Sequence, residues 1–311
     1  MKVLKKLFIG GIVVTFLSPF FYACGSGEGE GETDGADTAD MGDSGMKKSN
    51  GNAQNIFYAI PSPIELAQLI QKAGAAYNKD LLNSPSNDNI AKYVSNTSKA
   101  LNLGVYGADL SYTSVFDDNT QESILYLACT RKLAEALGVG NAFDEKTVDR
   151  VQANTGKKDS LFSIISDSYM TTDEMLKESQ RENASALVIA GGFIEAMYLG
   201  TQLAKTAKNN TAIITRIAEQ KGTLDNVVGL LSSNEQDAGV AAILTDMKAL
   251  KELFDQVTVV SAGTSPEVKT NPSTQVTTIG GKITYTISPE VFEKLTIKSS
   301  EIRNKITSGQ I

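Results

Sequence analysis

Residues 184–204 read A-S-A-L-V-I-A-G-G-F-I-E-A-M-Y-L-G-T-Q-L-A, the most apolar stretch of the chain after its first 23 residues. Segments with helical spacing flank it on both sides, so we expect it to be the central helix of a core. Its length would also suit a membrane span. Glu195 near its middle, with Glu182 and Lys205 at its ends, disfavours that alternative.

The two adjacent glycines of this stretch, Gly191 and Gly192, do not form a phosphate loop. No strand is expected before them and no G-K-[ST] follows them. Small residues at this place would instead let another helix approach closely. The pair therefore predicts tight helix packing.

The rest of the body also has helical spacing. Between Gln236 and Val257, apolar residues recur every three or four positions and charged residues fill the other face. Residues 117–137 repeat the pattern, and Gly138 then stops the helix. Further helices are expected to begin near Pro63, Ser86, Asp144, Asp159, Thr172, Asn209 and Thr223.

The last part of the chain changes character. Residues 257–272 resemble a loop, whereas 276–279 and 282–287 around Gly280-Gly281 predict a β-hairpin. Ser288 then caps a final helix. The most economical fold is all-α: a single multi-helix bundle with a minor β-hairpin near the C-terminus. Consecutive helix pairs leave an irregular α-solenoid open as an alternative.

The first 23 residues predict an export signal. Three lysines precede an apolar core that is too short for a comfortable membrane helix. The sequence Ala23-Cys24-Gly25-Ser26 suits lipoprotein processing, with residues 1–23 as the signal peptide. We therefore predict that Cys24 carries a lipid and attaches the chain to a membrane.

Residues 24–54 predict a disordered acidic tether. Positions 25–53 contain eight Gly and seven acidic residues against two lysines, and almost no large apolar residue. Such a stretch cannot bury enough apolar surface to offset the entropy lost on folding. The helical domain is accordingly predicted to span residues 55–311.

The export region, about residues 1–45, resembles that of Bacteroidota outer-membrane lipoproteins. The acidic residues soon after Cys24 are similar to the surface-export signal of these proteins, and Asp37-Thr38-Ala39 is similar to their short O-glycosylation motif, with Thr38 as acceptor. The resemblance implies a lipid-anchored protein of the outer membrane, on its periplasmic face or, slightly favoured, on the cell surface. The helical body resembles uncharacterised secreted proteins of the same phylum, which implies no activity.

The composition excludes several kinds of binding and catalysis. The formal net charge of −7 argues against a nucleic-acid partner, and the absence of His excludes Ser-His-Asp and Cys-His catalysis. Cys129 lies on an apolar helix face without a base, so it is expected to be a buried structural thiol. We expect no cofactor and no metal site.

Two places remain as a candidate pocket. Glu195 is costly in an apolar helix unless it is paired, and Tyr198 lies one turn away. In residues 104–112, two Gly and two Tyr bracket Asp109, so this segment could line a cleft with Asp109 and Tyr112. The plainer alternatives are a structural hydrogen-bonded Glu195 and a tight turn between helices capped by Asp109.

The sequence leaves two hypotheses for the function of this protein. The first is a lipid-anchored, non-enzymatic helical module of the cell envelope that binds a protein partner or supports an assembly. The second is a hydrolase or small-ligand-binding lipoprotein that uses the carboxylates of Asp109 and Glu195. A deep pocket where these groups converge would favour the second, and its absence would favour the first.

Overall fold

The computed structural model describes residues 71–311, apart from 117–119, 155, 209, 263–267, 272–275 and 280–281. The predicted signal peptide, tether, lipidation site and glycosylation site lie outside the described residues. So does the start of the helix predicted at Pro63. These expectations therefore stay predictions.

Over the described residues the protein is mostly helical, with a small antiparallel sheet near its C-terminus, as predicted. The α-helices are α3 (Asn87–Ala91), α4 (Asn96–Val115), α5 (Thr120–Ala136), α6 (Glu145–Ala153), α7 (Lys158–Glu178), α8 (Glu182–Thr206), α9 (Asn210–Ala218), α10 (Lys221–Ser232), α11 (Ala238–Phe254) and α12 (Pro289–Thr307). The short 3-10 turns are η1 (Lys79–Leu81) and η2 (Gly140–Phe143), and the strands are β1 (Thr258–Ala262), β2 (Val268–Asn271), β3 (Val276–Ile279) and β4 (Lys282–Thr286).

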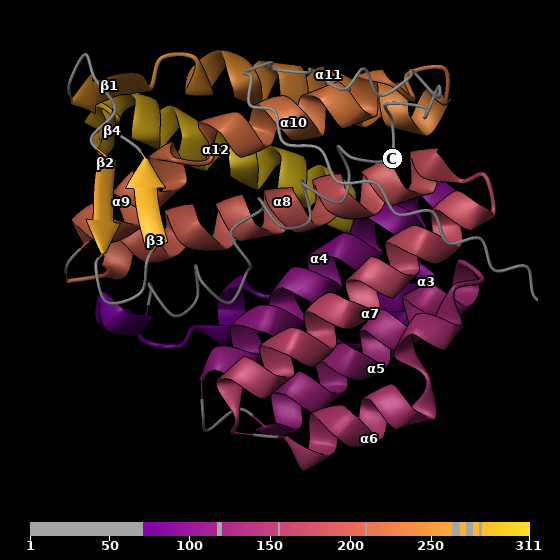
Figure 1. Ribbon diagram of the computed structural model, residues 1–311. Coiled ribbons are helices and arrows are strands. Elements are labelled where there is room, and N and C mark those ends of the chain that lie inside the picture. The colour runs from indigo at the N-terminus through magenta and orange to yellow at the C-terminus, as the bar shows by residue number, and fades with distance from the viewer. Residues whose placement is uncertain are drawn as a thin grey trace, which may run out of the picture. The chain divides into compact units, whose positions relative to one another are not determined.

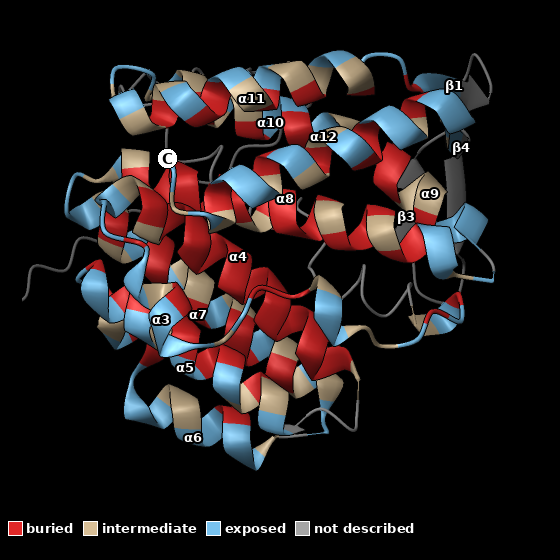
Figure 2. Ribbon diagram, turned by 180° about the vertical axis from the view of Figure 1, so that it is seen from behind, coloured by how far each residue is buried: buried red, intermediate tan, exposed pale blue. Residues whose placement is uncertain are grey.

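The central helix is α8, as its sequence predicts. Helices α4 and α7 pack against one side of it, and α10, α11 and α12 pack against the other (Figure 1). Both α4 and α8 are largely buried (Figure 2). Among the described helices, α8 is the one long and apolar enough to cross a membrane, and 89% of its most apolar window lies inside the protein.

Glycines let α4 and α8 approach one another closely, which confirms the prediction for Gly191. A Cβ on Gly191 would lie 1.9 Å from the carbonyl oxygen of Leu101 on α4. In the opposite direction, a Cβ on Gly104 would lie 2.0 Å from the carbonyl oxygen of Val188 on α8. Since both neighbours are backbone atoms, no side-chain adjustment could make room for a methyl group at either position.

The alternative of a tight turn within residues 104–112 is wrong, because this segment is the interior of α4. Gly104 permits the contact with α8, and Gly107 makes room for the Tyr169 side chain of α7. Both glycines are required by helix packing and not by a change in chain direction.

Most predicted helix starts are close to the observed ones. The side chains of Ser86, Asp144 and Ser288 cap α3, α6 and α12. The start predicted at Thr172 is wrong, because this residue lies inside α7. Its hydroxyl donates to the carbonyl oxygen of Ser168, one turn earlier, and so the side chain bonds within the helix that it was expected to begin.

The described strands form two two-stranded sheets, whose pairing differs from that of the predicted hairpin. Strand β4 pairs with β1, and β3 pairs with β2, both antiparallel. Strands β1 and β2 lie in residues 257–272, which the sequence favoured as a loop because of Gly263, Pro266 and Pro272. Strand β1, rich in Val and Thr, pairs with β4 in place of the expected β3, and this pairing places Val259 opposite Tyr285.

Candidate functional site

A buried ion pair joins α8 to α12. Glu195 is fully buried, and its carboxylate accepts hydrogen bonds from Arg303 Nε at 3.1 Å and from Arg303 Nη2 at 3.4 Å. The Arg303 side chain is 12% exposed. This two-point contact is the arrangement in which a guanidinium holds a carboxylate most firmly.

Asp109 of α4 joins this pair. It is also fully buried, and its Oδ2 accepts a hydrogen bond from the backbone N–H of Asn83 at 3.2 Å. Its carboxyl group lies close enough to that of Glu195 for each to affect the pKa of the other, and a hydrogen bond between them would require one of the two to carry a proton. We call Asp109, Glu195 and Arg303 the carboxyl cluster.

The proton of the carboxyl cluster belongs on Asp109. Burial raises the pKa of Asp109 well above its usual value, and the nearby negative charge of Glu195 raises it further. Burial also raises the pKa of Glu195, but Arg303 opposes that change. The stable arrangement is therefore a neutral Asp109 beside a Glu195 carboxylate that faces Arg303.

Three of the four residues of the candidate pocket meet here. Tyr198 lies one turn along α8 from Glu195, and its ring stacks under the guanidinium of Arg303, 4.7 Å from ring centroid to Cζ. Tyr112, one turn along α4 from Asp109, makes other contacts: its ring stacks against that of Tyr77, and its hydroxyl accepts from the backbone N–H of Asn78 at 3.0 Å.

The segment around the 3-10 turn η1 covers the carboxyl cluster. We call residues 77–84 the strap. Its Leu81 carbonyl oxygen accepts a hydrogen bond from Arg303 Nη2 at 3.2 Å, and its Asn83 N–H binds Asp109. The cluster is thus enclosed by α4, α8, α12 and the strap, which leaves it a core ion pair in this arrangement.

Two parts of this site, Arg303 and the strap, are not among the residues that the sequence analysis singled out. Arg303 does carry a signal, because it falls inside the buried stripe of α12 formed by Ser299, Ile302 and Ile306. A cation in such a stripe suggests a buried counter-charge. The strap carries no such signal, because its contacts are made largely by its main chain.

Cys129 is a free, buried thiol, as predicted. Burial raises its pKa to about 11, so it remains protonated at neutral pH. On the same helix Leu125 is 50% exposed, since the buried face of α5 runs through Tyr126, Leu127 and Leu133.

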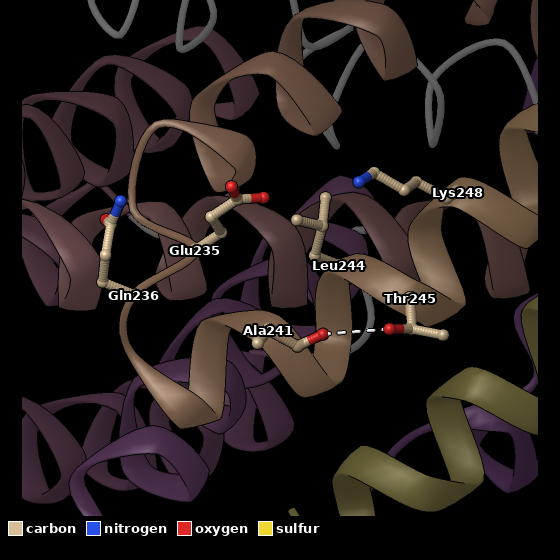
Figure 3. A pocket seen from close by; sticks show the side chains of 6 residues that line it. All are labelled: Glu235, Gln236, Ala241, Leu244, Thr245 and Lys248. Atoms are coloured by element: carbon tan, nitrogen blue, oxygen red, sulfur yellow. Dashed lines mark hydrogen bonds between the residues drawn. The ribbon is translucent and has the colours of Figure 1, made fainter.

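A second place to consider is an open pocket of about 440 Å³ beside the first turns of α11 (Figure 3). Glu235 and Lys248 extend toward one another above Leu244, and Thr245 bonds back to the carbonyl oxygen of Ala241 at 3.1 Å. None of the residues lining it belongs to the carboxyl cluster. Its one acid and one base, both beside open solvent, define no particular ligand.

Comparison with protein-family models, with curated proteins and with solved structures gives no match. The class of protein is therefore defined by architecture: a helical bundle built around α8, with a buried carboxyl cluster and a small antiparallel sheet.

Proposed function

We propose that this chain is a lipid-anchored, non-enzymatic module of the bacterial outer membrane that binds a protein partner. The lipid would be carried by Cys24, and the surface of the cell is the favoured side. The support for the anchor is the sequence Ala23-Cys24-Gly25-Ser26 after a short apolar core.

The observation that carries the binding role is the distribution of exposed apolar side chains. Of the six large hydrophobic residues that are exposed in the described part of the chain, three lie on strands β1 and β4: Val259, Val260 and Ile283. Within that part, each of these two strands pairs only with the other, so each has one unpaired edge. Strand β1 contains no charged residue and no proline, the usual protections of a strand edge.

This combination fits a partner that adds an extended, uncharged segment beside β1. Main-chain hydrogen bonds would supply affinity, and Val259 and Val260 would supply apolar contacts on the two faces. The small size of the sheet agrees with this role, because a two-stranded ladder gains most from a third strand.

The burial of the carboxyl cluster also favours a non-enzymatic role. Catalysis by Asp109 and Glu195 would require substrate to reach them, yet both are fully buried beneath the strap, and Glu195 is paired with Arg303. One feature favours the alternative, a carboxylate-based hydrolase: the two carboxyl groups lie close together, and burial raises the pKa of both, as in a pair of an acid and a base. Without access for substrate, it remains the second candidate.

The experiment uses the intact, lipidated chain purified from membranes with its bound proteins. A partner should be captured by wild type and lost with Val260→Lys, which puts a charge on the β1 edge. The matched control is Ile297→Lys, which changes an equally exposed residue of α12. Equal capture by both variants would refute strand addition as the mode of binding.

A second measurement tests the anchor and the alternative. Cys24→Ser should abolish labelling by a fatty-acid analogue and release the protein from the membrane. Wild type should hydrolyse none of a panel of glycans and peptides. Turnover that is lost in Asp109→Asn would replace the binding role with the hydrolase.

A further inference from the structure

The strap separates the carboxyl cluster from solvent. On its other sides the cluster is enclosed by the helices α4, α8 and α12, which supply Asp109, Glu195 and Arg303. The strap is thinner, because it consists of the short turn η1 and its flanking residues, and Lys79 and Asp80 on this turn are exposed. A movement of the strap alone is therefore the smallest change that would let water reach the two acids.

Side chains of the neighbouring helices hold the main chain of the strap. Five of them bond to its main-chain groups, and they belong to Tyr106, Asp109, Tyr112, Tyr126 and Arg303. Burial raises the pKa of the three tyrosines, so they stay neutral around pH 7, and arginine stays charged. Among the five, Asp109 is the group that can change its charge there.

Both ends of the strap are fixed. Before it, Ala73 and Ala75 are buried, and the Gln71 side chain accepts a hydrogen bond from a lysine of α7 at 3.2 Å. After it, Asn89 is buried and donates to the hydroxyl of Tyr106 at 2.9 Å. The strap can therefore move away from the cluster only as a loop, while the chain on either side of it stays in place.

The charges of the carboxyl cluster balance only while one acid is protonated. With a proton on Asp109, the carboxylate of Glu195 and the guanidinium of Arg303 neutralise each other. Without that proton, the cluster holds two negative charges and one positive charge, and both acids are fully buried. An uncompensated charge in such a place costs free energy, which exposure to water would recover.

The two oxygens of Asp109 have different surroundings. Oδ2 accepts from the Asn83 N–H at 3.2 Å, whereas Oδ1 is buried and receives no hydrogen bond from the described residues. A protonated Oδ1 could donate to the neighbouring carboxylate of Glu195, but an ionised Oδ1 could only accept. Water is the donor that an opening of the strap would supply to it.

The other titratable groups that interact with Asp109 in the described part of the chain stay neutral around pH 7. Burial raises the pKa of each, and they are Tyr93, Tyr106, Tyr126, Tyr169, Tyr198 and the thiol of Cys129. One further acid contacts the strap: Glu122 of α5 hydrogen-bonds to Tyr77 at its N-terminal end. The burial of Tyr77 and this bond also raise the pKa of its hydroxyl.

We propose that the strap is a pH-dependent cover of the carboxyl cluster, closed while Asp109 carries a proton and open when both acids are ionised. The opening is local, because the helices keep their own packing and both ends of the strap stay fixed. It would give solvent access to Asp109 and Glu195, which is the access that catalysis by these acids would require. It needs no partner at the β1 edge.

The test is hydrogen exchange of the full chain in detergent, measured by mass spectrometry between about pH 5 and pH 9 and corrected for the intrinsic rate at each pH. In the open form Asp109 should titrate near its ordinary value of about 4, whereas burial raises its pKa in the closed form. The protection of the strap should therefore fall by up to about tenfold per pH unit, and level off once Asp109 is ionised in the closed form as well. Peptides from α11 should keep their protection.

Two variants identify the group responsible. Asp109→Asn cannot ionise, so its strap should stay protected over the whole range. The matched control is Glu122→Gln, which changes the other acid that contacts the strap and should keep the wild-type response. Protection of α11 in each variant shows that the helical body is folded.

The proposal is overturned if the protection of the strap in wild type does not change with pH. Equal losses in the strap and in α11 would mean global unfolding and would overturn it too. So would a wild-type response in Asp109→Asn, or the loss of the response in Glu122→Gln. None of these results bears on partner capture at the β1 edge, so the two proposals can fail separately.

Discussion

Arg303 Nε lies 3.1 Å from Oε2 of Glu195, joining the last helix of the chain to its central helix across 108 residues of sequence. Glu195 is fully buried, and such a carboxylate is tolerated only with a partner. Because Arg303 also binds the Leu81 carbonyl oxygen, one guanidinium fixes α8, α12 and the strap relative to each other.

Replacing Glu195 by Gln should therefore destabilise the fold. The change leaves the buried charge of Arg303 without its direct counter-charge, at a cost of about 3 kcal/mol in the free energy of unfolding. We expect a cost at the lower end of the range usual for a broken buried ion pair, because Asp109 can ionise and partly replace Glu195 as the counter-charge of Arg303. Urea unfolding of wild type and Glu195→Gln measures the difference.

The control for this change is Glu135→Gln, which removes the acid of an exposed ion pair with Arg131. Its cost should be below about 1 kcal/mol. A Glu195→Gln protein as stable as wild type would contradict a structural role for the pair. Higher stability together with loss of a ligand-induced shift in melting temperature would point to a binding role instead.

Asp109→Asn should have the opposite effect at neutral and alkaline pH. Asparagine resembles the protonated carboxyl: its oxygen can accept from the Asn83 N–H, and its amide can donate to Glu195. We expect a stability equal to or higher than that of wild type near pH 7. This result would distinguish the two acids, because the corresponding change at Glu195 is costly.

The pH dependence gives a sharper measurement. Burial and the Glu195 charge raise the pKa of Asp109 in the folded protein. Its stabilising contribution is then complete below the unfolded value of about 4 and is lost as the pH rises through the folded pKa. Unfolding free energies between about pH 5 and pH 9 should fall less steeply for Asp109→Asn than for wild type. The exposed Asp167→Asn should keep the wild-type slope.

The helical fold could be predicted because its signal is local. Apolar spacing and capping residues place α11 and α12 close to their observed bounds, and the apolar run of α8 makes it the core helix. Strand pairing could not be predicted in the same way. Which partner β4 selects depends on contacts between β1 and β4 that lie far apart in sequence.

Part of the candidate site could be predicted from the sequence, and the rest depends on contacts between residues far apart in the chain. A lone acid in an apolar helix predicts that Glu195 has a partner, but nothing local identifies Arg303 as that partner. Gly104 and Gly107 were misinterpreted because glycine permits both a turn and a close helix contact. Only the three-dimensional contact with α8 distinguishes the two.

The predicted tether gives a prediction about stability. Deleting residues 25–53 while keeping Cys24 should leave the melting temperature within about 3 °C of wild type, because their composition offers no core. Circular dichroism of the detergent-solubilised proteins measures it. A larger loss would mean that the segment docks on the helical body.

Gly104→Ala tests the contact that sets the spacing of α4 and α8. The new Cβ would lie 2.0 Å from the Val188 carbonyl oxygen and 2.5 Å from the Gly192 nitrogen, so the helices must separate. We expect a loss of about 3 kcal/mol in unfolding free energy, since well-packed elements do not absorb an added carbon easily.

The matched control is Gly229→Ala in α10, where a Cβ meets nothing within 4 Å. That change should stabilise the protein by roughly 0.5–1 kcal/mol, because alanine favours a helix over glycine. Chemical unfolding of the two variants beside wild type decides the matter. Equal effects would show that α4 and α8 are not in the close contact described.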